Sequence, residues 1–174
     1  TNTLEIEKIN KLASNIQLNL LIEDITTIEQ LGNNIQSKIG IFIKIDVGYH
    51  RTGIDPKKLD LINNILSKLK EYKFLDFKGF LGHAGHSYSA KNKDEILHIH
   101  AFSVNRMKEL KANCIADYPN LITSLGDTPT CSIAKDYDGV DEIRPGNFVF
   151  YDLTQWSLGV CGLENIAVAM ACPI

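Results

Sequence analysis

Apolar positions along the first part of the chain switch between helical and strand spacing. Residues 4–14 carry apolar side chains at helical intervals, and residues 16–24 then alternate apolar and polar side chains like a strand. Asp24 or Thr26 can cap a second helix that runs to about residue 35. The segment IGIFIKID at 39–46 predicts a buried strand, so the chain begins with two helix–strand units.

The alternation of helix and strand continues up to about residue 127. Pro56 stands where the first turn of a third helix would begin, and apolar positions between 59 and 69 would cover a sheet. FKGFLGHAG at 77–85 is the next predicted strand, followed by a helix at about 92–112 and a strand in LITSLGD at 121–127. Successive helix–strand units of this kind predict an α/β fold with a parallel sheet and right-handed crossovers.

The pattern changes past Gly126, where no further helix is predicted. FVFYDL at 148–153 and IAVAMA at 166–171 have the composition of strands. We therefore expect residues 1–144 to form one α/β part and residues 145–174 to begin a β domain. The chain opens without a methionine and ends in the apolar run ENIAVAMACPI, which favours a piece of a longer polypeptide.

The composition indicates which kind of ligand or partner the protein could bind. The 174 residues are 44% hydrophobic and 22% charged, with a formal net charge of −3 and both signs interspersed. This leaves no basic face for nucleic acid or a membrane surface, and no apolar run approaches the roughly 20 residues that cross a bilayer. The four cysteines are widely spaced, as expected for buried thiols in a reducing compartment. We expect a cytoplasmic protein that binds a small molecule.

Polar and glycine residues follow three of the predicted strands. They occupy residues 46–51, 82–88 and 124–130. In parallel α/β sheets and barrels the carboxyl ends of the strands point at the ligand. Three successive strands therefore direct polar groups to one place, and the second of our candidate stretches, 82–88, contains both a histidine pair and a tyrosine.

Four ordered motifs, KIDVGYHRTGI, GHAGHSY, SLGDTPT and EIRPGNFVFYD, resemble the pyridoxal-phosphate enzymes of the D-threonine aldolase and D-serine dehydratase type. These enzymes are related more distantly to alanine racemase, in fold-type III. The resemblance runs from about residue 20 to the end of the chain. It implies the second half of a (β/α)8 TIM-type barrel followed by the start of a β domain.

The resemblance also implies what lies outside this chain. In the family the lysine that forms the Schiff base with pyridoxal 5'-phosphate lies near the end of an early barrel strand, which has no counterpart here. We therefore expect the isolated chain to be inactive. A divalent metal, zinc or manganese, would be held by ligands in the C-terminal domain beyond Ile174. A D-amino acid substrate and a homodimer are implied as partners, without nucleic acid or membrane.

The cofactor phosphate needs main-chain and hydroxyl donors that approach it closely. Gly126, Thr128, Gly146 and Asn147 fit that task, because glycine-rich turns expose backbone N–H groups and Thr128 adds a hydroxyl. The resemblance implies that Arg51 hydrogen-bonds the phenolic oxygen of the cofactor. It also implies that Lys44, on the same strand, supports this arginine rather than forming the Schiff base.

Tyr88 and His83 end the next strand, where a ring could stack on the pyridine and an imidazole could move a proton. We predict that both are catalytic together with Arg51, with Tyr88 the stronger candidate for a cofactor contact. Arg144 matches the arginine that pairs with the pyridine nitrogen in alanine racemase. Pro145 follows it here, so its role stays open.

The resemblance implies a lyase acting on a D-β-hydroxy amino acid, and D-serine dehydration is the preferred reaction. D-threonine aldolase is an alternative, because nothing in the sequence decides whether dehydration or Cα–Cβ cleavage follows. A non-catalytic barrel protein that only binds the cofactor is another. Such proteins lack a β domain, so the strands predicted after Arg144 favour the lyase.

Several of the polar and aromatic residues at the strand ends could also have a purely structural role. His83 and His86 could be a metal pair, but glycines on both sides place them in a strand-to-loop segment where their spacing does not converge, so we predict no metal site here. Asp127 could be a helix cap, with Pro129 in the first turn. His50 could pack at the strand edge, and Tyr49 and Trp156 could serve a core or an interface.

Overall fold

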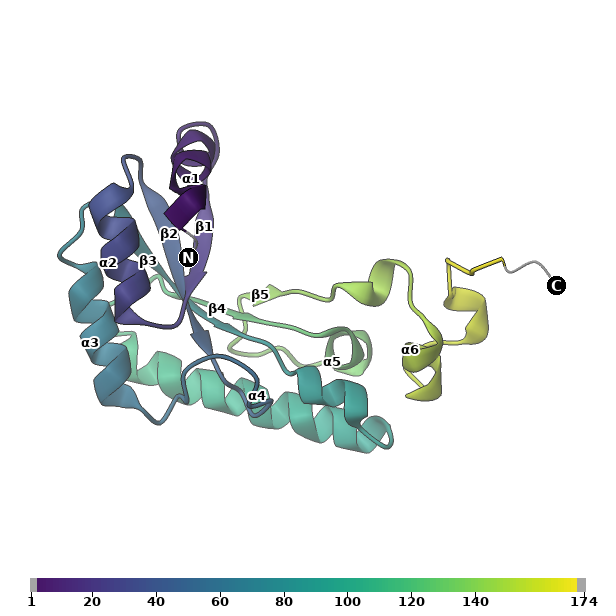
Figure 1. The fold of residues 1–174 in the computed structure, drawn as a ribbon. Helices are drawn as coiled ribbons and strands as arrows, with labels where there is room; N and C mark the ends of the chain where they lie inside the picture. Colours follow the sequence, from purple (N-terminus) through teal and green to yellow (C-terminus); the bar gives the residue numbers. More distant parts are fainter. Residues whose placement is uncertain (1–2, 172–174) are drawn as a thin grey trace.

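The computed structural model describes residues 3–171, which form an α/β unit on one parallel sheet (Figure 1). The strands are β1 (Asn19–Ile22), β2 (Ile39–Ile45), β3 (Leu75–Gly82), β4 (Ile122–Leu125) and β5 (Glu142–Ile143). The α-helices are α1 (Ile6–Ala13), α2 (Ile25–Asn34), α3 (Leu59–Leu69), α4 (Lys93–Cys114), α5 (Thr128–Ile133) and α6 (Leu153–Ser157). Short 3-10 helices are η1 (Thr3–Glu5), η2 (Gly85–Ser89), η3 (Asn147–Val149) and η4 (Leu163–Asn165).

The strands hydrogen-bond in chain order, so each lies beside its neighbours in sequence. The helices α2, α3 and α4 connect successive strands and lie along the same side of the sheet in Figure 1. In a doubly wound fold the strand order would reverse and helices would cover both faces. Consecutive parallel strands with helices on one side are instead the arrangement of a barrel wall. The predicted parallel α/β architecture is confirmed.

The main core lies between the sheet and these helices. Ile41, Ile43 and Ile45 of β2 are buried, and they belong to one apolar cluster that includes Ile62 of α3 and Met107 of α4. Complete burial of a side chain of this size stabilises by roughly 1.5–3 kcal/mol. The cluster holds β2 firmly and so fixes where the loop that follows it begins.

A bulge interrupts the register between β2 and β3. Ile41 lies opposite Phe77, whereas Phe42 lies opposite Gly79. The backbone of Gly79 has φ +155°, and a Cβ at this position would collide with the backbone of Ile122 on β4. Glycine is required here because β3 must approach β4 more closely than a side chain allows.

The prediction that helices stop at Gly126 is wrong. Asp127 caps α5 and Asp152 caps α6, each accepting a hydrogen bond from a backbone N–H three residues on. Asp127 is therefore the helix cap suggested by the sequence, with Pro129 in the first turn. The helix expected from Pro56 begins three residues later, at Leu59. The two-residue strand β5, which pairs with β4, was not predicted.

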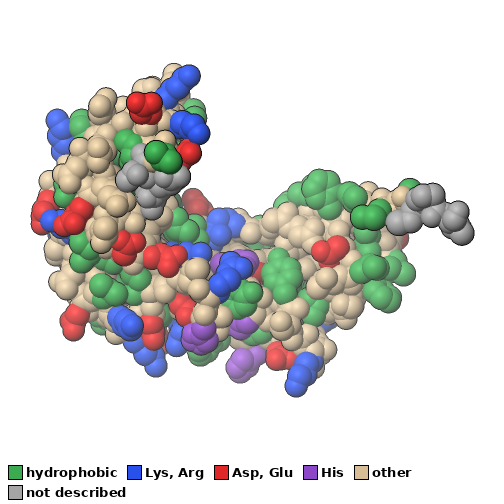
Figure 2. All heavy atoms as spheres, in the orientation of Figure 1, with side chains coloured by type: hydrophobic (Ala, Val, Ile, Leu, Met, Phe, Trp, Pro, Cys, Tyr) green, Lys and Arg blue, Asp and Glu red, His purple; other side chains and the backbone are tan. Residues whose placement is uncertain are grey.

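The strands predicted at 148–153 and 166–171 are absent from the described residues. Asn147 instead accepts backbone hydrogen bonds from Phe150 and Tyr151, which curls the chain into η3. The apolar side chains that suggested strands stay exposed, including Phe148 and Phe150. This part extends away from the sheet (Figure 1) and carries apolar side chains at the right of Figure 2. The division at residue 145 into two domains stays a prediction.

No helix within residues 3–171 combines the length and the apolar character needed to span a membrane.

Candidate active site

The loops that follow β2, β3 and β4 lie at one edge of the sheet, because these strands are parallel and adjacent. Every residue predicted for the site lies after the end of a strand. The first loop carries Arg51, the second carries His83 and Tyr88, and the third carries Gly126 and Thr128. Arg144, Gly146 and Asn147 follow β5. The sheet order thus brings four separate segments of sequence to the same edge.

Asp46 organises the loop after β2. Its Oδ1 accepts the backbone N–H of Gly48 at 2.9 Å and that of His50 at 3.0 Å, and its Oδ2 lies 2.8 Å from Nδ1 of the His50 ring. His50 adopts φ +56°, a conformation that non-glycine residues rarely use. The carboxylate therefore holds a tight and strained turn immediately before Arg51. His50 supports this turn from a side chain that is itself exposed.

Arg51 lies over an aromatic ring rather than against a carboxylate. Its guanidinium carbon is 4.9 Å from the centroid of the Tyr49 ring. The same ring contacts His86 in a stacked arrangement and His83 edge-on, both with centroids 6.1 Å away. Tyr49 thereby connects Arg51 on the first loop to the two histidines on the second.

His83 connects the second loop to the third. Its Nδ1 lies 2.8 Å from the carbonyl oxygen of Gly126. A carbonyl only accepts, so Nδ1 carries the proton and, in the neutral ring, Nε2 keeps a free lone pair. His83 is therefore arranged as a proton acceptor at Nε2.

Tyr88, Thr128 and Asn147 form a hydrogen-bonded series across three segments. The backbone N–H of Thr128 donates to the phenolic oxygen of Tyr88 at 3.3 Å. The backbone N–H of Asn147 donates to Oγ1 of Thr128 at 2.8 Å. Tyr88 and Thr128, 40 residues apart in sequence, are thus in direct contact. The buried Thr128 hydroxyl donates no hydrogen bond among residues 3–171, so its proton can serve a further acceptor.

The Arg144 side chain reaches from the end of β5 to the ends of β4 and β3. Its Nε donates to Oγ of Ser124 at 2.8 Å, and one terminal nitrogen donates to the carbonyl oxygens of Gly82 and Ser124. Burial lowers the pKa of this guanidinium below its usual value. Arg144 therefore ties the ends of β3 and β4 to the end of β5, and its predicted contact with the cofactor stays untested.

The two predicted phosphate glycines differ in their surroundings. A Cβ on Gly126 would collide with the backbone of Arg144, so glycine is needed there for strand packing. A Cβ on Gly146 would meet nothing within 4 Å. Open space therefore borders Gly146, next in sequence to Asn147 and its bond to Thr128.

Positive charge at this edge is not neutralised by protein. Neither Arg51 nor Arg144 forms an ion pair within the described part of the chain. Figure 2 shows histidine side chains gathered near the middle of the visible face with basic side chains close by. Burial lowers the pKa of His86, although Asp127 and Asp46 oppose this effect. The guanidinium of Arg51, which has no ion pair among the described residues, favours an anionic ligand at this edge.

Asp46 is ionised in this arrangement. Burial alone would raise its pKa, but hydrogen bonds from the backbone of His50 and Gly48, and from the His50 ring, outweigh burial and lower it. The carboxylate is therefore an acceptor for all three donors at neutral pH.

Sequence reasoning placed three contributors in the strand-end stretches but did not predict their contacts in the site. Tyr49 was assigned to a core or an interface, yet the residue is 36% exposed and its ring contacts Arg51. Ser124 was not singled out as the partner of Arg144. The contact of Asp46 with His50 could have been predicted from the sequence, because Asp46 lies at the end of an apolar strand and His50 follows it by four positions. Lys44, predicted to support Arg51, makes no side-chain hydrogen bond to it among residues 3–171.

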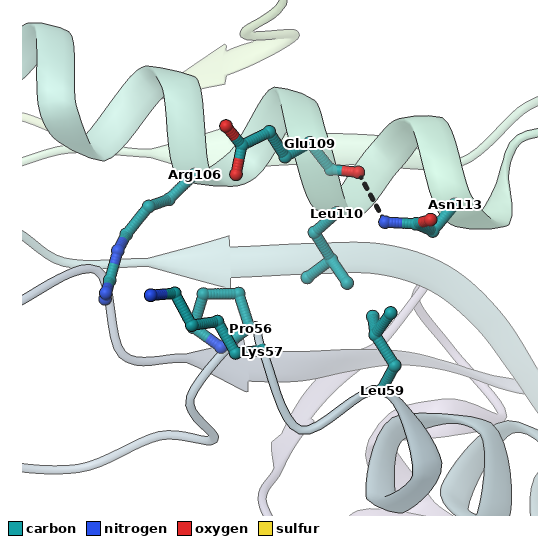
Figure 3. A pocket seen from close by; sticks show the side chains of 7 residues that line it. All are labelled: Pro56, Lys57, Leu59, Arg106, Glu109, Leu110 and Asn113. Atoms are coloured by element: carbon teal, nitrogen blue, oxygen red, sulfur yellow. Dashed lines mark hydrogen bonds between the residues drawn. The ribbon is translucent and has the colours of Figure 1, made fainter.

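A pocket lies elsewhere, between α4 and the segment leading into α3 (Figure 3). It has a volume of about 270 Å³ and is lined by residues that include Pro56, Lys57, Arg106 and Glu109. It contains none of the predicted site residues. Within residues 3–171, no group of three or more histidine, cysteine or acidic side chains is arranged to hold a metal ion.

Comparison with known proteins identifies the family. The family model described as "Alanine racemase, N-terminal domain" matches residues 2–153. D-serine dehydratase of Dictyostelium discoideum is 36% identical over 179 residues, covering 95% of this chain and 43% of that protein. D-threo-3-hydroxyaspartate dehydratase of Delftia sp. strain HT23 is 29% identical over 160 residues, covering 88% of this chain and 41% of its own length.

A solved structure of D-threo-3-hydroxyaspartate dehydratase from Delftia sp. HT23 superposes with a TM-score of 0.87 at 24% identity, over 96% of this chain and 45% of that one. The chain thus spans less than half the length of the relatives it matches. These matches confirm the resemblance inferred from the four motifs. The chain belongs to the alanine racemase N-terminal domain family.

Proposed function

We propose that this chain forms part of a pyridoxal-phosphate-dependent lyase that dehydrates D-serine to pyruvate and ammonia. The observation that carries the proposal is the hydrogen-bonded series from Tyr88 through Thr128 to Asn147 beside the free guanidinium of Arg51. The relatives named as dehydratases support the choice of reaction. The substrate, the cofactor and the activity of the whole protein are all part of this proposal.

The residues at the strand ends fit the cofactor phosphate. The space beside Gly146 is free of protein atoms where a side chain would lie. Thr128 has a hydroxyl proton to donate, because its oxygen already accepts from the backbone of Asn147. These groups would hold the phosphate. Arg51 would donate to the phenolic oxygen of the cofactor and favour its anionic form.

The cofactor, when bound, supplies an electron sink for the negative charge that develops at Cα of the amino acid. His83 contributes a proton acceptor at Nε2, since Nδ1 is fixed on the carbonyl of Gly126. Tyr88 contributes a phenol held by the backbone of Thr128. Arg144 keeps the ends of three strands together and thereby positions His83 and Gly126.

The test is an assay of the full-length protein with D-serine and with D-threonine. Dehydration of D-serine gives pyruvate and dehydration of D-threonine gives 2-oxobutyrate, each with ammonia. We expect these oxo acids to form. Glycine and acetaldehyde as the only products of D-threonine would instead establish an aldolase, and binding of pyridoxal phosphate without turnover would establish a non-catalytic cofactor-binding protein.

A homodimer, a cytoplasmic location and a divalent metal bound elsewhere in the full-length protein are further parts of the proposal. The described residues hold no group of three or more metal-ligating side chains, so the ligands of this metal would lie outside them. Analytical ultracentrifugation of the purified full-length protein and its metal content check the dimer and the metal, and fractionation of cells checks the location. A monomer without zinc or manganese would contradict them.

A further inference from the structure

The Tyr49 ring lies between a candidate cofactor ligand and the loop after β3. On one side, the guanidinium of Arg51 is 4.9 Å from the ring centroid. Elsewhere around the ring, His86 stacks at an interplanar angle of 21° and His83 approaches edge-on at 73°. Arg51 has no ion pair within the described residues, so this ring is the main protein contact recorded for its guanidinium.

Gly85 makes room for the ring. A Cβ at this position would collide with three ring carbons of Tyr49. Gly85 is buried at the start of η2, two residues after His83. The absence of a side chain there lets the Tyr49 ring settle against the second loop, which belongs to a different strand.

The loop after β2, which carries Tyr49, is fixed by its own hydrogen bonds as well. Asp46 binds the backbone N–H groups of Gly48 and His50, which flank Tyr49 in the sequence. Gly48 has φ +121° and His50 has φ +56°, so the backbone on both sides of Tyr49 adopts a restricted left-handed geometry. The loop thus presents Tyr49 in one orientation, with its ring beneath Arg51.

We infer that Tyr49 is a positioning residue, whose ring holds the Arg51 guanidinium ready to bind the phenolic oxygen of the cofactor. The inference rests on the proposed function. An arginine side chain has many rotamers, and fixing it at the moment of binding costs conformational entropy. A guanidinium already held over an aromatic face loses less freedom and keeps its N–H groups available for an acceptor.

The test is a double-mutant cycle on pyridoxal 5'-phosphate affinity of the full-length protein. Tyr49→Leu removes the aromatic face, and we expect about three- to tenfold weaker binding. Tyr49→Phe keeps the face and should recover most of the lost affinity. In an Arg51→Ala background, Tyr49→Leu should have no further effect, because the residue through which it acts is gone.

A second pair of variants avoids changing the tyrosine. Gly85→Ala should displace the Tyr49 ring and weaken cofactor binding to a similar degree. Gly32→Ala is the matched control. A Cβ there would also collide with a tyrosine ring, that of Tyr72, but Gly32 lies in α2 and not in a strand-end loop. The control should lower the thermal unfolding temperature without changing cofactor affinity.

Equal losses from Tyr49→Leu with and without Arg51 would overturn the inference, since the ring would then act independently. An unchanged affinity in Arg51→Ala alone would remove Arg51 from the cofactor site and the inference with it. Failure of the proposed function is distinguishable. If the protein is not a cofactor-binding protein, wild type would bind no pyridoxal phosphate at all; if it is an aldolase or a non-catalytic binder, the product assay would show this while the affinities of the variants still test the inference.

Discussion

Arg144 is held by several hydrogen bonds to main-chain and side-chain oxygens. We predict that Arg144→Ala lowers the free energy of unfolding by about 2 kcal/mol, because hydrogen bonds from charged groups contribute roughly 1.5–3 kcal/mol and the oxygens of Ser124 and Gly82 lose their donor. Urea unfolding followed by circular dichroism measures this. Lys135→Ala removes the same charge from an exposed position and should change stability little.

His86 should make stability depend on pH. Burial lowers its pKa, so in the range just below 6.5 the folded protein keeps the ring neutral while the unfolded chain takes up a proton. Unfolding therefore binds a proton in this range, and stability falls as the pH falls below about 6.5. Comparing urea unfolding at pH 7.5 and 5.5 should show a smaller loss in His86→Gln than in wild type. An equal loss in both would exclude His86 as the cause.

At the scale of elements, two helices have nearly the same N-cap with different surroundings. Asp24 accepts from the backbone and hydroxyl of Thr27, and Asp127 accepts from the backbone and hydroxyl of Thr130. Only Asp127 also binds a buried serine, Ser87, and Asp127 is 1% exposed. This makes Asp24 a natural control for Asp127.

We predict that Asp24→Ala costs about 1 kcal/mol of unfolding free energy, the usual value of a cap. Asp127→Ala should cost about 3 kcal/mol, since it also leaves the Ser87 hydroxyl buried without its acceptor. Thermal or urea unfolding of both variants checks the ranking. Equal losses would mean that the contact with Ser87 contributes little.

The α-helices and strands up to β4 could be predicted from the sequence, because the apolar residues of each follow either the helical or the strand period. The 3-10 helix η2 was not predicted. The segment 148–153 could not be predicted in this way. Its aromatic and β-branched composition, FVFY, is typical of a strand, but a strand also needs a partner, and Phe148 and Phe150 are exposed instead. The short helix α6 depends on one cap, Asp152, and is too short for periodicity to reveal.

The sequence predicted at which edge of the sheet the candidate residues would meet, but not the side-chain contacts that they would make there. Parallel strand ends were enough to expect Tyr88 near Thr128. The contact of Tyr49 with Arg51, and the bonds of Arg144 to β3, depend on loop conformation and register. A one-residue shift would change every one of these side-chain contacts, so local patterns do not encode them.

The central claim is that the strand ends bind a phosphorylated ring with Thr128 at its phosphate. The most direct test compares the affinities of the full-length protein for pyridoxal 5'-phosphate and for pyridoxal, which lacks the phosphate. Loss of one charge-assisted hydrogen bond, worth roughly 1.5–3 kcal/mol, should reduce the ratio of these affinities about tenfold or more in Thr128→Ala. An unchanged ratio, with both ligands still bound, would contradict the claim.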